Sequence, residues 1–314
     1  MADRPQESLR NTYGKTLLAL GRKNPDIIVL DADLAKSTQT QYFGKEIGDR
    51  FIDIGLSEQD MVSTAAGISL TGKTVFASSF CVFLAGRVFD QVRQSVCYNR
   101  ANVKLVATHS GLGVGEDGAT HQALEDIALM RTLPGMRVIV PADSVETASV
   151  IEFVAKTEGP FYVRLTRSNQ GVIHPADYRF RFGQIDVLRT GSDVTLAACG
   201  TMVEKMLDAA DLLAASGISA AVLNVSTVKP LDGETLLRFA RATRGLVTME
   251  DHTRAGGLGS ALAEYLCQHH PVPMRILGVD DQFGCSGKPE ELYRHFGLTA
   301  EAAATAAREL ANPR

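Results

Sequence analysis

The segment 108–122 combines side chains that can transfer protons with residues that let the backbone turn. It reads Thr-His-Ser-Gly-Leu-Gly-Val-Gly-Glu-Asp-Gly-Ala-Thr-His-Gln, so that His109, Glu116, Asp117 and His121 share one stretch with four glycines. Histidine and carboxylate side chains donate, accept and transfer protons, and glycines permit tight turns and close approach to a ligand. Because the segment has neither a helical nor a strand period, we expect a binding or catalytic loop and no packed helix or strand.

Each histidine of this segment also has a plainer interpretation. A single His109 or His121 is most often a core or capping residue, but two histidines beside two acids in one glycine-rich loop favour chemistry. Metal binding is a further alternative, although the His-x11-His spacing has no local helical logic. We therefore expect no metal ligands in this chain.

A glutamate follows the predicted strand 51–54 at the start of a predicted helix. Glu58 lies within Gly55-Leu-Ser-Glu-Gln-Asp-Met61, and ligands of open α/β sheets bind at the carboxyl ends of strands. The location therefore favours a site residue. The alternative is a Ser-x-x-Asp cap made by Ser57 and Asp60, in which Glu58 only decorates the first helical turn.

A pair of phenylalanines follows the predicted strand 74–77. Phe80 and Phe83 are three residues apart at the start of the next predicted helix, where their rings could stack on a flat ligand. Aromatic residues at helical spacing also pack into cores, so a core role is the alternative interpretation.

Four polar residues are candidates for contacts with an anion. Lys36, Ser37 and Arg167 follow predicted strands, and Arg10 lies near the N-terminus. The donor fork of an arginine can hold a phosphate. The alternative for each residue is a solvated position on the surface.

Glycine motifs that bind nucleotides are absent. The chain has neither GxGxxG after its first predicted strand nor GxxxxGK[ST], which disfavours nicotinamide binding and nucleotide hydrolysis. Gly256-Gly-Leu-Gly259 could instead open a helix and bind a ligand, and tight packing of a strand on a helix explains it equally well.

Composition limits the class of protein. The chain has 314 residues, of which 45% are hydrophobic and 22% charged, and this fits about two globular domains. A net charge of −4 and a pI near 6.0 disfavour nucleic acids and anionic membranes as partners. The first residues lack the apolar core that is typical of a secretory leader, no apolar run reaches spanning length, and the five cysteines form no CxxC pair. We therefore expect a cytoplasmic protein with buried, reduced thiols.

Short apolar runs alternate with segments of helical period, which is typical of parallel sheets covered by helices. Strands are predicted at 26–31, 51–54, 74–77, 103–107, 137–140 and 161–164, with helices at 7–20, 59–71, 83–98, 121–132 and 144–156. After a polar and aromatic passage at 168–182, strands are predicted at 194–198, 220–223, 245–248 and 274–277, and two short helices within 289–310. The predicted fold is α/β, with two consecutive open parallel or mixed sheets covered by helices.

These motifs, taken in order, resemble the carboxyl-terminal half of transketolase. The resemblance runs from Arg10-Asn-Thr-Tyr-Gly14 through the motifs at 55–61 and 109–122 to Val228-Lys-Pro-Leu-Asp232, Glu250-Asp-His252 and Ser286-Gly-Lys-Pro-Glu-Glu-Leu292. It implies a thiamine-diphosphate-binding pyrimidine domain over 1–180 and a transketolase C-terminal domain over 181–314. The implied activity is transfer of a two-carbon ketol unit between a ketose phosphate and an aldose phosphate.

The resemblance also implies which residues meet the cofactor. Glu58 resembles the glutamate that hydrogen-bonds the pyrimidine ring nitrogen of thiamine diphosphate and so promotes removal of the thiazolium proton. Phe80 and Phe83 resemble the aromatic wall against the pyrimidine ring. Leu56 and Asp33 are also expected at the cofactor.

A second implied set of residues meets the substrate. His109, Asp117 and His121 resemble groups that bind sugar hydroxyls, and the two histidines, together with Glu58, are the expected catalytic residues. The clamp on the substrate phosphate is expected to comprise Arg10, Ser37 and Arg167.

One part of the implied active site is missing from the sequence. The family binds Mg2+ and the diphosphate through an amino-terminal domain with a Gly-Asp-Gly motif, whereas here Gly48-Asp49 is followed by Arg50. The resemblance therefore implies a split enzyme, in which an N-terminal transketolase subunit supplies the domain that binds the diphosphate and Mg2+. A heterotetramer with two copies of each chain is expected.

Other thiamine enzymes share this two-domain half. The beta subunit of a 2-oxo-acid dehydrogenase generally lacks the arrangement around His109, and deoxyxylulose-phosphate synthase usually has arginine at that position. A non-catalytic assembly subunit is a third alternative, but the presence of Glu58 and both histidines argues against it.

Gly86 stands where some transketolases have a tyrosine, so part of the cofactor wall is expected to differ. A specialised route for a modified sugar is an alternative to pentose phosphate metabolism.

Overall fold

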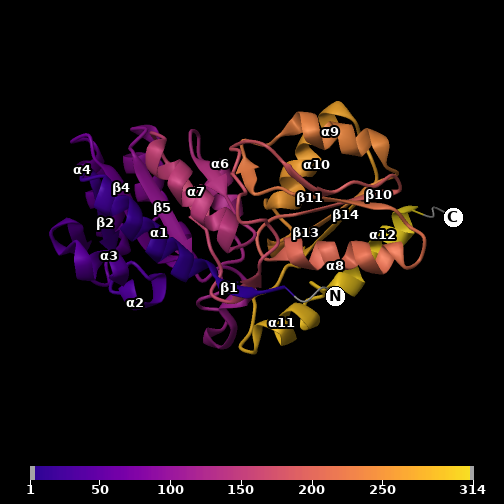
Figure 1. Cartoon of the computed structure of the whole chain (residues 1–314), viewed down its shortest axis with the longest axis horizontal. Helices are drawn as coiled ribbons and strands as arrows, with labels where there is room; N and C mark the ends of the chain where they lie inside the picture. The colour runs from indigo at the N-terminus through magenta and orange to yellow at the C-terminus, as the bar shows by residue number, and fades with distance from the viewer. Residues whose placement is uncertain (1–3, 312–314) are drawn as a thin grey trace.

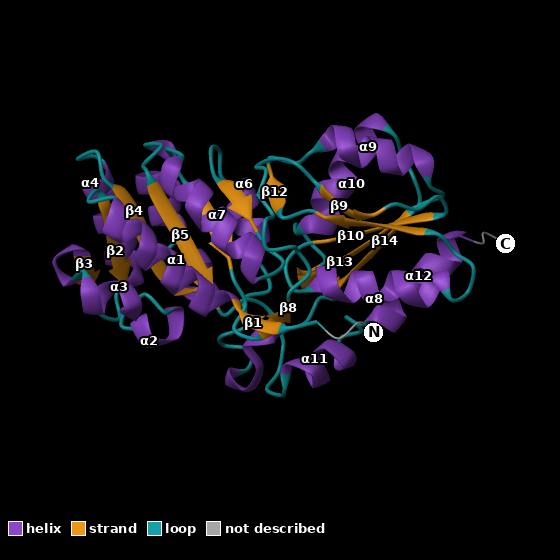
Figure 2. Cartoon of the chain, viewed as in Figure 1, coloured by secondary structure: helices purple, strands orange, loops and turns teal. Residues whose placement is uncertain are grey.

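Parallel strands form two separate sheets in the computed structural model, which describes residues 4–311 (Figure 1). The first sheet lies in the N-terminal lobe and the second in the C-terminal lobe, and helices flank both (Figure 2). This arrangement confirms the predicted fold class of two consecutive α/β units.

Seven strands make up the first sheet, in the order β12-β6-β7-β5-β4-β2-β3. All pairs are parallel except the edge pair of β12 and β6. The central strands are buried on both faces, which explains their continuous apolar runs. The strands are β2 (Ile27–Asp31), β3 (Phe51–Asp53), β4 (Thr74–Phe80), β5 (Val103–Thr108), β6 (Arg137–Ile139), β7 (Phe161–Arg164) and β12 (Thr227–Lys229).

Helices cover both faces of this sheet because side chains alternate along each strand. Val29 and Phe76 pack with the helices α1 (Leu9–Lys23) and α7 (Ser144–Lys156). Their neighbours Leu30 and Ala77 pack on the opposite face. The elements on that face are α4 (Glu58–Ser69), the π-helical turns η2 (Phe83–Arg87) and η3 (Val92–Tyr98), α5 (Phe89–Gln91) and α6 (Asp126–Thr132).

Short elements complete the first lobe around the ends of its strands. The helices α2 (Ala35–Thr38) and α3 (Gln41–Glu46) and the 3-10 turn η1 (Gly48–Arg50) connect β2 to β3. A 3-10 segment, η4 (Leu112–Asp117), follows β5.

Five strands make up the second sheet, in the order β14-β13-β10-β11-β9, with only β9 antiparallel. The strands are β9 (Asp186–Arg189), β10 (Val194–Ala198), β11 (Ala220–Asn224), β13 (Leu246–Thr253) and β14 (Met274–Val279). One face packs against α8 (Met202–Ala214) and α12 (Ala300–Ala311), and the other against α9 (Gly233–Ala242) and α10 (Leu258–His269). The helix α11 (Pro289–His295) lies beside η4 of the first lobe.

Two strand pairings tie distant segments together. β1 (Gln6–Ser8) pairs with β8 (Asn169–Gly171), and β12 leaves the second lobe to pair with β6 of the first sheet. Neither pairing was predicted, because strands of three residues carry little periodic signal. The division at residue 180 stays a prediction, and β12 joins the first sheet although it follows that division.

Three sequence expectations were wrong in detail. The helix predicted at 121–132 begins only at Asp126, because long-range hydrogen bonds hold the preceding residues: the Gly111 amide donates to Ala123, and the Thr253 amide to Leu124. The segment 108–122 is not an unpacked loop, since it contains η4 and is buried through Gly115. All five cysteines are free thiols, but Cys267 and Cys285 are exposed.

None of the helices within residues 4–311 is both long and apolar enough to cross a membrane.

A buried histidine links the two lobes through charged partners. The imidazole of His174 has Nδ1 at 3.0 Å from Oδ2 of Asp143, which caps α7, and Nε2 at 3.2 Å from Oδ2 of Asp186, on β9. Although burial works against its charge, these carboxylates and nearby Glu146 raise the pKa of His174 to about 10. Tyr178 packs on the imidazole, with ring centroids 4.1 Å apart. His174 is therefore a cation that joins the first lobe to the second.

His174→Gln should lower the free energy of unfolding by about 2 kcal/mol at pH 6, because it removes the charged partner of two carboxylates, one of which, Asp186, is also hydrogen-bonded to Nε2. The pKa of His174 is higher in the folded chain than its ordinary value of 6.5. Its stabilisation is therefore complete below about pH 6.5 and is lost as the pH rises toward about 10. Urea unfolding at several pH values measures this difference. The exposed His295→Gln is the control, and a difference that grows with pH would contradict the assignment.

Candidate active site

The candidate residues gather at one edge of the first sheet. Asp33 and Ser37 follow β2, Glu58 follows β3, Phe80 ends β4, His109 follows β5 and Arg167 follows β7. These strands are parallel neighbours, so their carboxyl ends meet at the same edge, where open α/β sheets bind ligands. The tertiary structure thus brings together residues that are spread over 134 positions of the sequence, from Asp33 to Arg167.

Glu58 is the first residue of α4, and its side chain is only 2% exposed. Its Oε2 accepts a hydrogen bond of 2.7 Å from Nη1 of Arg87. Ser57 makes no side-chain cap on this helix, so the alternative of a Ser-x-x-Asp cap is wrong. A carboxylate at a helix N-terminus is favoured by the helix dipole, and its Arg87 partner offsets the cost of removing it from water.

Four flat groups stack in series beside this carboxylate. The ring of His109 lies 3.7 Å from that of Phe80, which stacks in turn on Phe83 at 5.9 Å and 12° between planes. The guanidinium of Arg87 lies 4.2 Å from the Phe83 centroid. His121 meets both phenylalanine rings edge-on, at 6.3 and 5.5 Å. The two phenylalanines therefore form a wall between the predicted catalytic residues.

His109 is buried in an unusual backbone conformation. Its φ is +57°, a left-handed value that a residue other than glycine rarely adopts and that is common at functional sites. Nδ1 lies 2.9 Å from Oγ1 of Thr108. Burial, the charges of Arg10 and Arg167, and His121 lower the pKa of His109 to about 3. The imidazole is therefore neutral near pH 7 and able both to donate and to accept a hydrogen bond.

The second lobe holds the loop that carries His109. The carboxylate of Asp251, on β13, accepts hydrogen bonds from the amides of Leu112 at 2.8 Å and Gly113 at 3.2 Å, and from the hydroxyl of Tyr293 at 3.0 Å. A Cβ on Gly111, whose φ is +59°, would lie 2.3 Å from this carboxylate. The glycines of this segment therefore serve close packing between the two lobes.

Two arginines form a cationic corner at the same edge. Nη1 of Arg10 donates to the backbone oxygen of Ser37 at 2.7 Å, and its buried Nε has no hydrogen-bond partner among residues 4–311. Burial and the charge of Arg167 lower the pKa of Arg10. Nη1 of Arg167 lies 3.8 Å from Oε2 of Glu116 and 3.6 Å from Oδ2 of Asp117. A bound anion would relieve the repulsion between the arginines and satisfy Nε.

Asp33 and Leu56 lie outside this wall. Asp33 is exposed, and its amide donates to Oδ1 of Asp53, which also accepts from the Gly55 amide. Leu56 is 78% exposed. Asp33 opens onto a cleft of about 610 Å³, whose lining residues are Asp33, Leu34, Ala35, Lys36, Ser37, Gln41, Gly44, Lys45, Phe51 and Asp53. The described residues thus group Asp33 with Ser37 and Lys36 rather than with Glu58.

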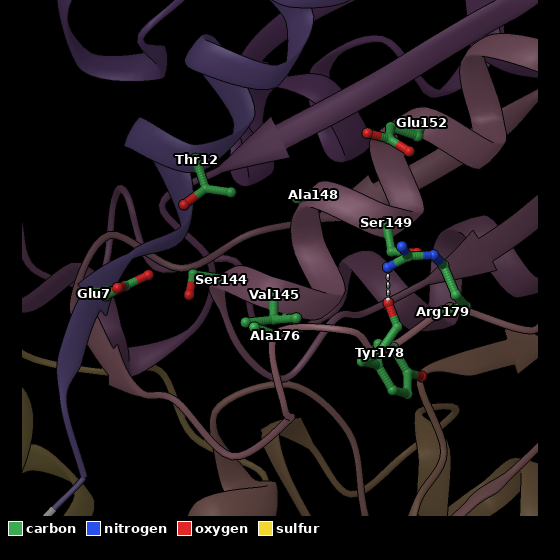
Figure 3. Close-up of a pocket in the computed structure, with 10 residues that line it drawn as sticks. All are labelled: Glu7, Thr12, Ser144, Val145, Ala148, Ser149, Glu152, Ala176, Tyr178 and Arg179. Atoms are coloured by element: carbon green, nitrogen blue, oxygen red, sulfur yellow. Dashed lines mark hydrogen bonds between the residues drawn. The ribbon is translucent and has the colours of Figure 1, made fainter.

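Another hollow, of about 370 Å³, lies between α1, α7 and the segment after His174 (Figure 3). Its lining residues are Glu7, Thr12, Ser144, Val145, Ala148, Ser149, Glu152, Ala176, Tyr178 and Arg179. None of the residues predicted to act lies there. Within the described part of the chain, no group of three His, Cys, Asp or Glu side chains is arranged to hold a metal ion.

The glycine turn at 256–259 serves packing. Glu250, buried on β13, accepts hydrogen bonds from the amides of Leu258 at 2.6 Å and Gly259 at 2.9 Å, in the first turn of α10. A Cβ on Gly257 would lie 2.0 Å from the same carboxylate. The chain therefore fills this helix N-terminus with its own carboxylate, which favours the packing alternative over a ligand.

Sequence reasoning missed three residues that position the site. Arg87 contacts Glu58, and Asp251 contacts the 109–122 segment. Asp31 holds the turn that carries Ser37. Oδ2 of Asp31 accepts from the hydroxyls of Thr38 at 2.7 Å and Thr40 at 2.8 Å. Burial and the charge of Asp53 raise the pKa of Asp31 to about 6 against these bonds. Of these three residues, only Asp31 carries a signal in the sequence, because it is an acid at the end of an apolar run.

Comparison with known families matches two domains that follow one another along the chain, although β12 of the second domain pairs into the first sheet. Residues 6–171 match the transketolase pyrimidine-binding domain, and residues 183–302 match the transketolase C-terminal domain.

Individual proteins and structures are similar over nearly the whole chain. A 6-deoxy-6-sulfo-D-fructose transketolase subunit of Clostridium sp. (strain MSTE9) is 42% identical over 96% of this chain and 94% of its own length. An apulose-4-phosphate transketolase subunit of Phocaeicola vulgatus is 36% identical over 93% and 94%. The solved structure of a split gene transketolase, described as an inactive beta4 tetramer, has a TM-score of 0.90 and 45% identity, covering 98% of this chain and 99% of that one.

Gly111→Ala should lower the free energy of unfolding by about 3 kcal/mol, because the new methyl group collides with the Asp251 carboxylate. Gly72→Ala is a matched control, since Gly72 has a φ of +87° but nothing within 4 Å of its would-be Cβ. It should cost only the left-handed strain, about 1 kcal/mol. Chemical denaturation measures both variants. Equal losses of unfolding free energy in the two variants would show that Asp251 does not restrict side-chain size at position 111.

Proposed function

This chain belongs to the transketolase family, and on that premise we propose that it is one subunit of a split transketolase that depends on thiamine diphosphate. The reaction is transfer of a two-carbon ketol unit from a ketose to an aldose. The chain supplies the pyrimidine-binding and C-terminal domains, and a partner subunit supplies the remainder of the active site.

The observation that carries this proposal is the buried carboxylate of Glu58 beside an aromatic wall. A carboxylate that is withdrawn from water and aligned with flat rings suits an aminopyrimidine, which has ring nitrogens and a flat face. Phe80 and Phe83 supply the wall in this proposal. The residues present thus fit the pyrimidine end of thiamine diphosphate. Leu56 and Asp33 are proposed to meet the cofactor once the partner subunit encloses it.

The histidines are proposed to act on the sugar. When bound, thiamine diphosphate supplies the electron sink for the two-carbon unit. Nδ1 of His109 contacts Thr108, so we assign Nε2 to a sugar oxygen, where a neutral imidazole both donates and accepts. His121 and Asp117 belong to the same segment as His109 and are proposed to bind hydroxyl groups and move protons at the carbonyl.

Arg10 and Arg167, with Ser37, are proposed to bind the anionic end of the substrate. The unpartnered Nε of Arg10 and the mutual repulsion of the two arginines support an anion at this corner. One similar protein is named for a sugar with a sulfonate group and another for a sugar phosphate. The corner suits a phosphate or another tetrahedral oxyanion, and we favour phosphorylated sugars.

The partner subunit is proposed to bind Mg2+ and the diphosphate group. The matched domains are the pyrimidine-binding and C-terminal ones, and the similar proteins include separate transketolase subunits. We propose a heterotetramer with two copies of each chain, located in the cytoplasm, where free thiols such as these persist. The isolated chain should then show little ketol transfer.

Glu58→Gln should lower turnover of the reconstituted complex by about a hundredfold or more, because the amide keeps the shape of the side chain but cannot exchange a proton. Assembly with the partner should survive. Two-carbon transfer between sugar phosphates and size-exclusion chromatography measure the two properties. Glu301→Gln, exposed in the first turn of α12, is the control and should leave turnover unchanged.

Two results would sink the catalytic assignment. Unchanged turnover of the Glu58→Gln complex would favour a non-catalytic assembly subunit. Strong ketol transfer by the isolated chain would show that no partner is needed.

Arg10→Met should raise the KM for a phosphorylated acceptor roughly tenfold, since it removes a charged partner of the anion. The KM for the matching unphosphorylated sugar should change little. Arg22→Met is a matched control on the same helix, where Arg22 pairs with Glu46 on the surface. Equal effects of Arg10→Met on both sugars would exclude a phosphate contact.

A further inference from the structure

We propose that the guanidinium of Arg87 occupies the place of the cofactor's aminopyrimidine in the free chain and must swing out when the cofactor binds. The inference rests on the proposed function, because it concerns the same pocket. It gives Arg87 a role in cofactor loading that the motif at 80–83 does not contain.

The contacts of Arg87 are those that a bound aminopyrimidine is expected to make. Nη1 donates to Oε2 of Glu58 at 2.7 Å, and Cζ of the guanidinium lies over the Phe83 ring, 4.2 Å from its centroid. Both groups are flat, and both present N–H donors next to a carbon flanked by nitrogens. A carboxylate oxygen that is engaged by Arg87 cannot hydrogen-bond a ring nitrogen in the same direction.

Other flat groups already crowd the ring of Phe83. One face of Phe83 is turned to Phe80, at 5.9 Å, which is less than the roughly 7 Å that an inserted ring would need. Cζ of Arg87 lies over the Phe83 ring, 4.2 Å from its centroid, and His121 meets the same ring edge-on at 5.5 Å. At the other end of the series, His109 covers Phe80 at 3.7 Å and is itself only 3% exposed. A ring that stacks on Phe83 beside Glu58 must therefore displace Arg87.

Arg87 is the member of the series that can move. Its side chain is 46% exposed, whereas Glu58, which it contacts, is 2% exposed. The backbone beside it is also uncrowded, because the neighbouring Gly86 has nothing within 4 Å of the position of a Cβ. The backbone is held separately, because the Arg87 carbonyl accepts a hydrogen bond of 3.1 Å from Nε2 of Gln59. The side chain can thus leave Glu58 while the π-helical turn η2 stays in place.

Displacement has an energetic consequence for cofactor loading. The Arg87–Glu58 pair stabilises the free chain, and it also keeps a lone carboxylate from being buried without a partner. Binding of the cofactor has to break this pair, so part of the binding free energy is lost. Removing the guanidinium should therefore tighten cofactor binding, whereas removing a residue that holds the cofactor would weaken it.

The test is the affinity of the reconstituted complex for thiamine diphosphate, measured by isothermal titration calorimetry in the presence of Mg2+. Arg87→Met keeps the apolar stem and removes the guanidinium, and it should bind thiamine diphosphate about fivefold more tightly than the natural chain. Arg238→Met is the matched control, because Arg238 also stacks on a phenylalanine, Phe239, at 5.2 Å, but lies on α9 of the second lobe. Its affinity should not change.

Added guanidinium ion separates displacement from a general loosening of the site. At concentrations far below those that unfold proteins, guanidinium chloride should weaken thiamine diphosphate binding to the Arg87→Met complex by competing for Glu58. It should affect the natural complex much less. Neither the gain from Arg87→Met nor the guanidinium effect should remain when Glu58→Gln is also present.

Each outcome decides the proposal. Unchanged or weaker binding by Arg87→Met, while the natural complex binds thiamine diphosphate, overturns displacement and leaves the proposed function standing. A natural complex that binds no thiamine diphosphate overturns both.

Discussion

Burial of one carboxylate organises the candidate site. Glu58 is withdrawn from water at the first turn of α4, where the helix dipole and Arg87 compensate its charge. Removing a charged carboxylate from water costs free energy, and this position requires a rigid strand end, a well-placed helix and a shielding aromatic wall. The first sheet provides all three at its carboxyl edge. Arg87 connects this carboxylate to the aromatic wall of Phe83 and Phe80, on which His109 and His121 pack.

The second lobe takes part in the site without contributing a predicted catalytic residue. Asp251 reaches from β13 to the amides that follow His109, and Tyr293 supports the same carboxylate. His174 adds a charged link between the lobes through Asp143 and Asp186. The His109 loop is therefore positioned by both sheets, which gives a physical reason for the two domains to occur in one chain.

Sequence patterns predicted that candidate residues at strand ends lie at one edge of the sheet, and their roles stay predictions. Glu58, Phe80, His109 and Arg167 each follow a short apolar run, and parallel strands place such residues at one edge. The patterns failed where long-range hydrogen bonds override local period. Residues 121–125 read as the start of a helix, but contacts with Gly111 and Thr253 hold this part of the backbone in a loop. The grouping of Asp33 away from the aromatic wall was equally invisible.

Residue types and their spacing were sufficient to identify the α/β class, the order of the strands and helices along the chain, and the family resemblance, because each is a local or ordered property of the sequence. The sequence patterns did not identify the partners of the buried charged side chains. Arg87 is 29 residues from Glu58, and Asp251 is 139 residues from Leu112. Hydrophobic periodicity predicts which side chains are buried, but it does not predict which charged side chains pair with one another. The pairs form only when the sheets and helices pack together.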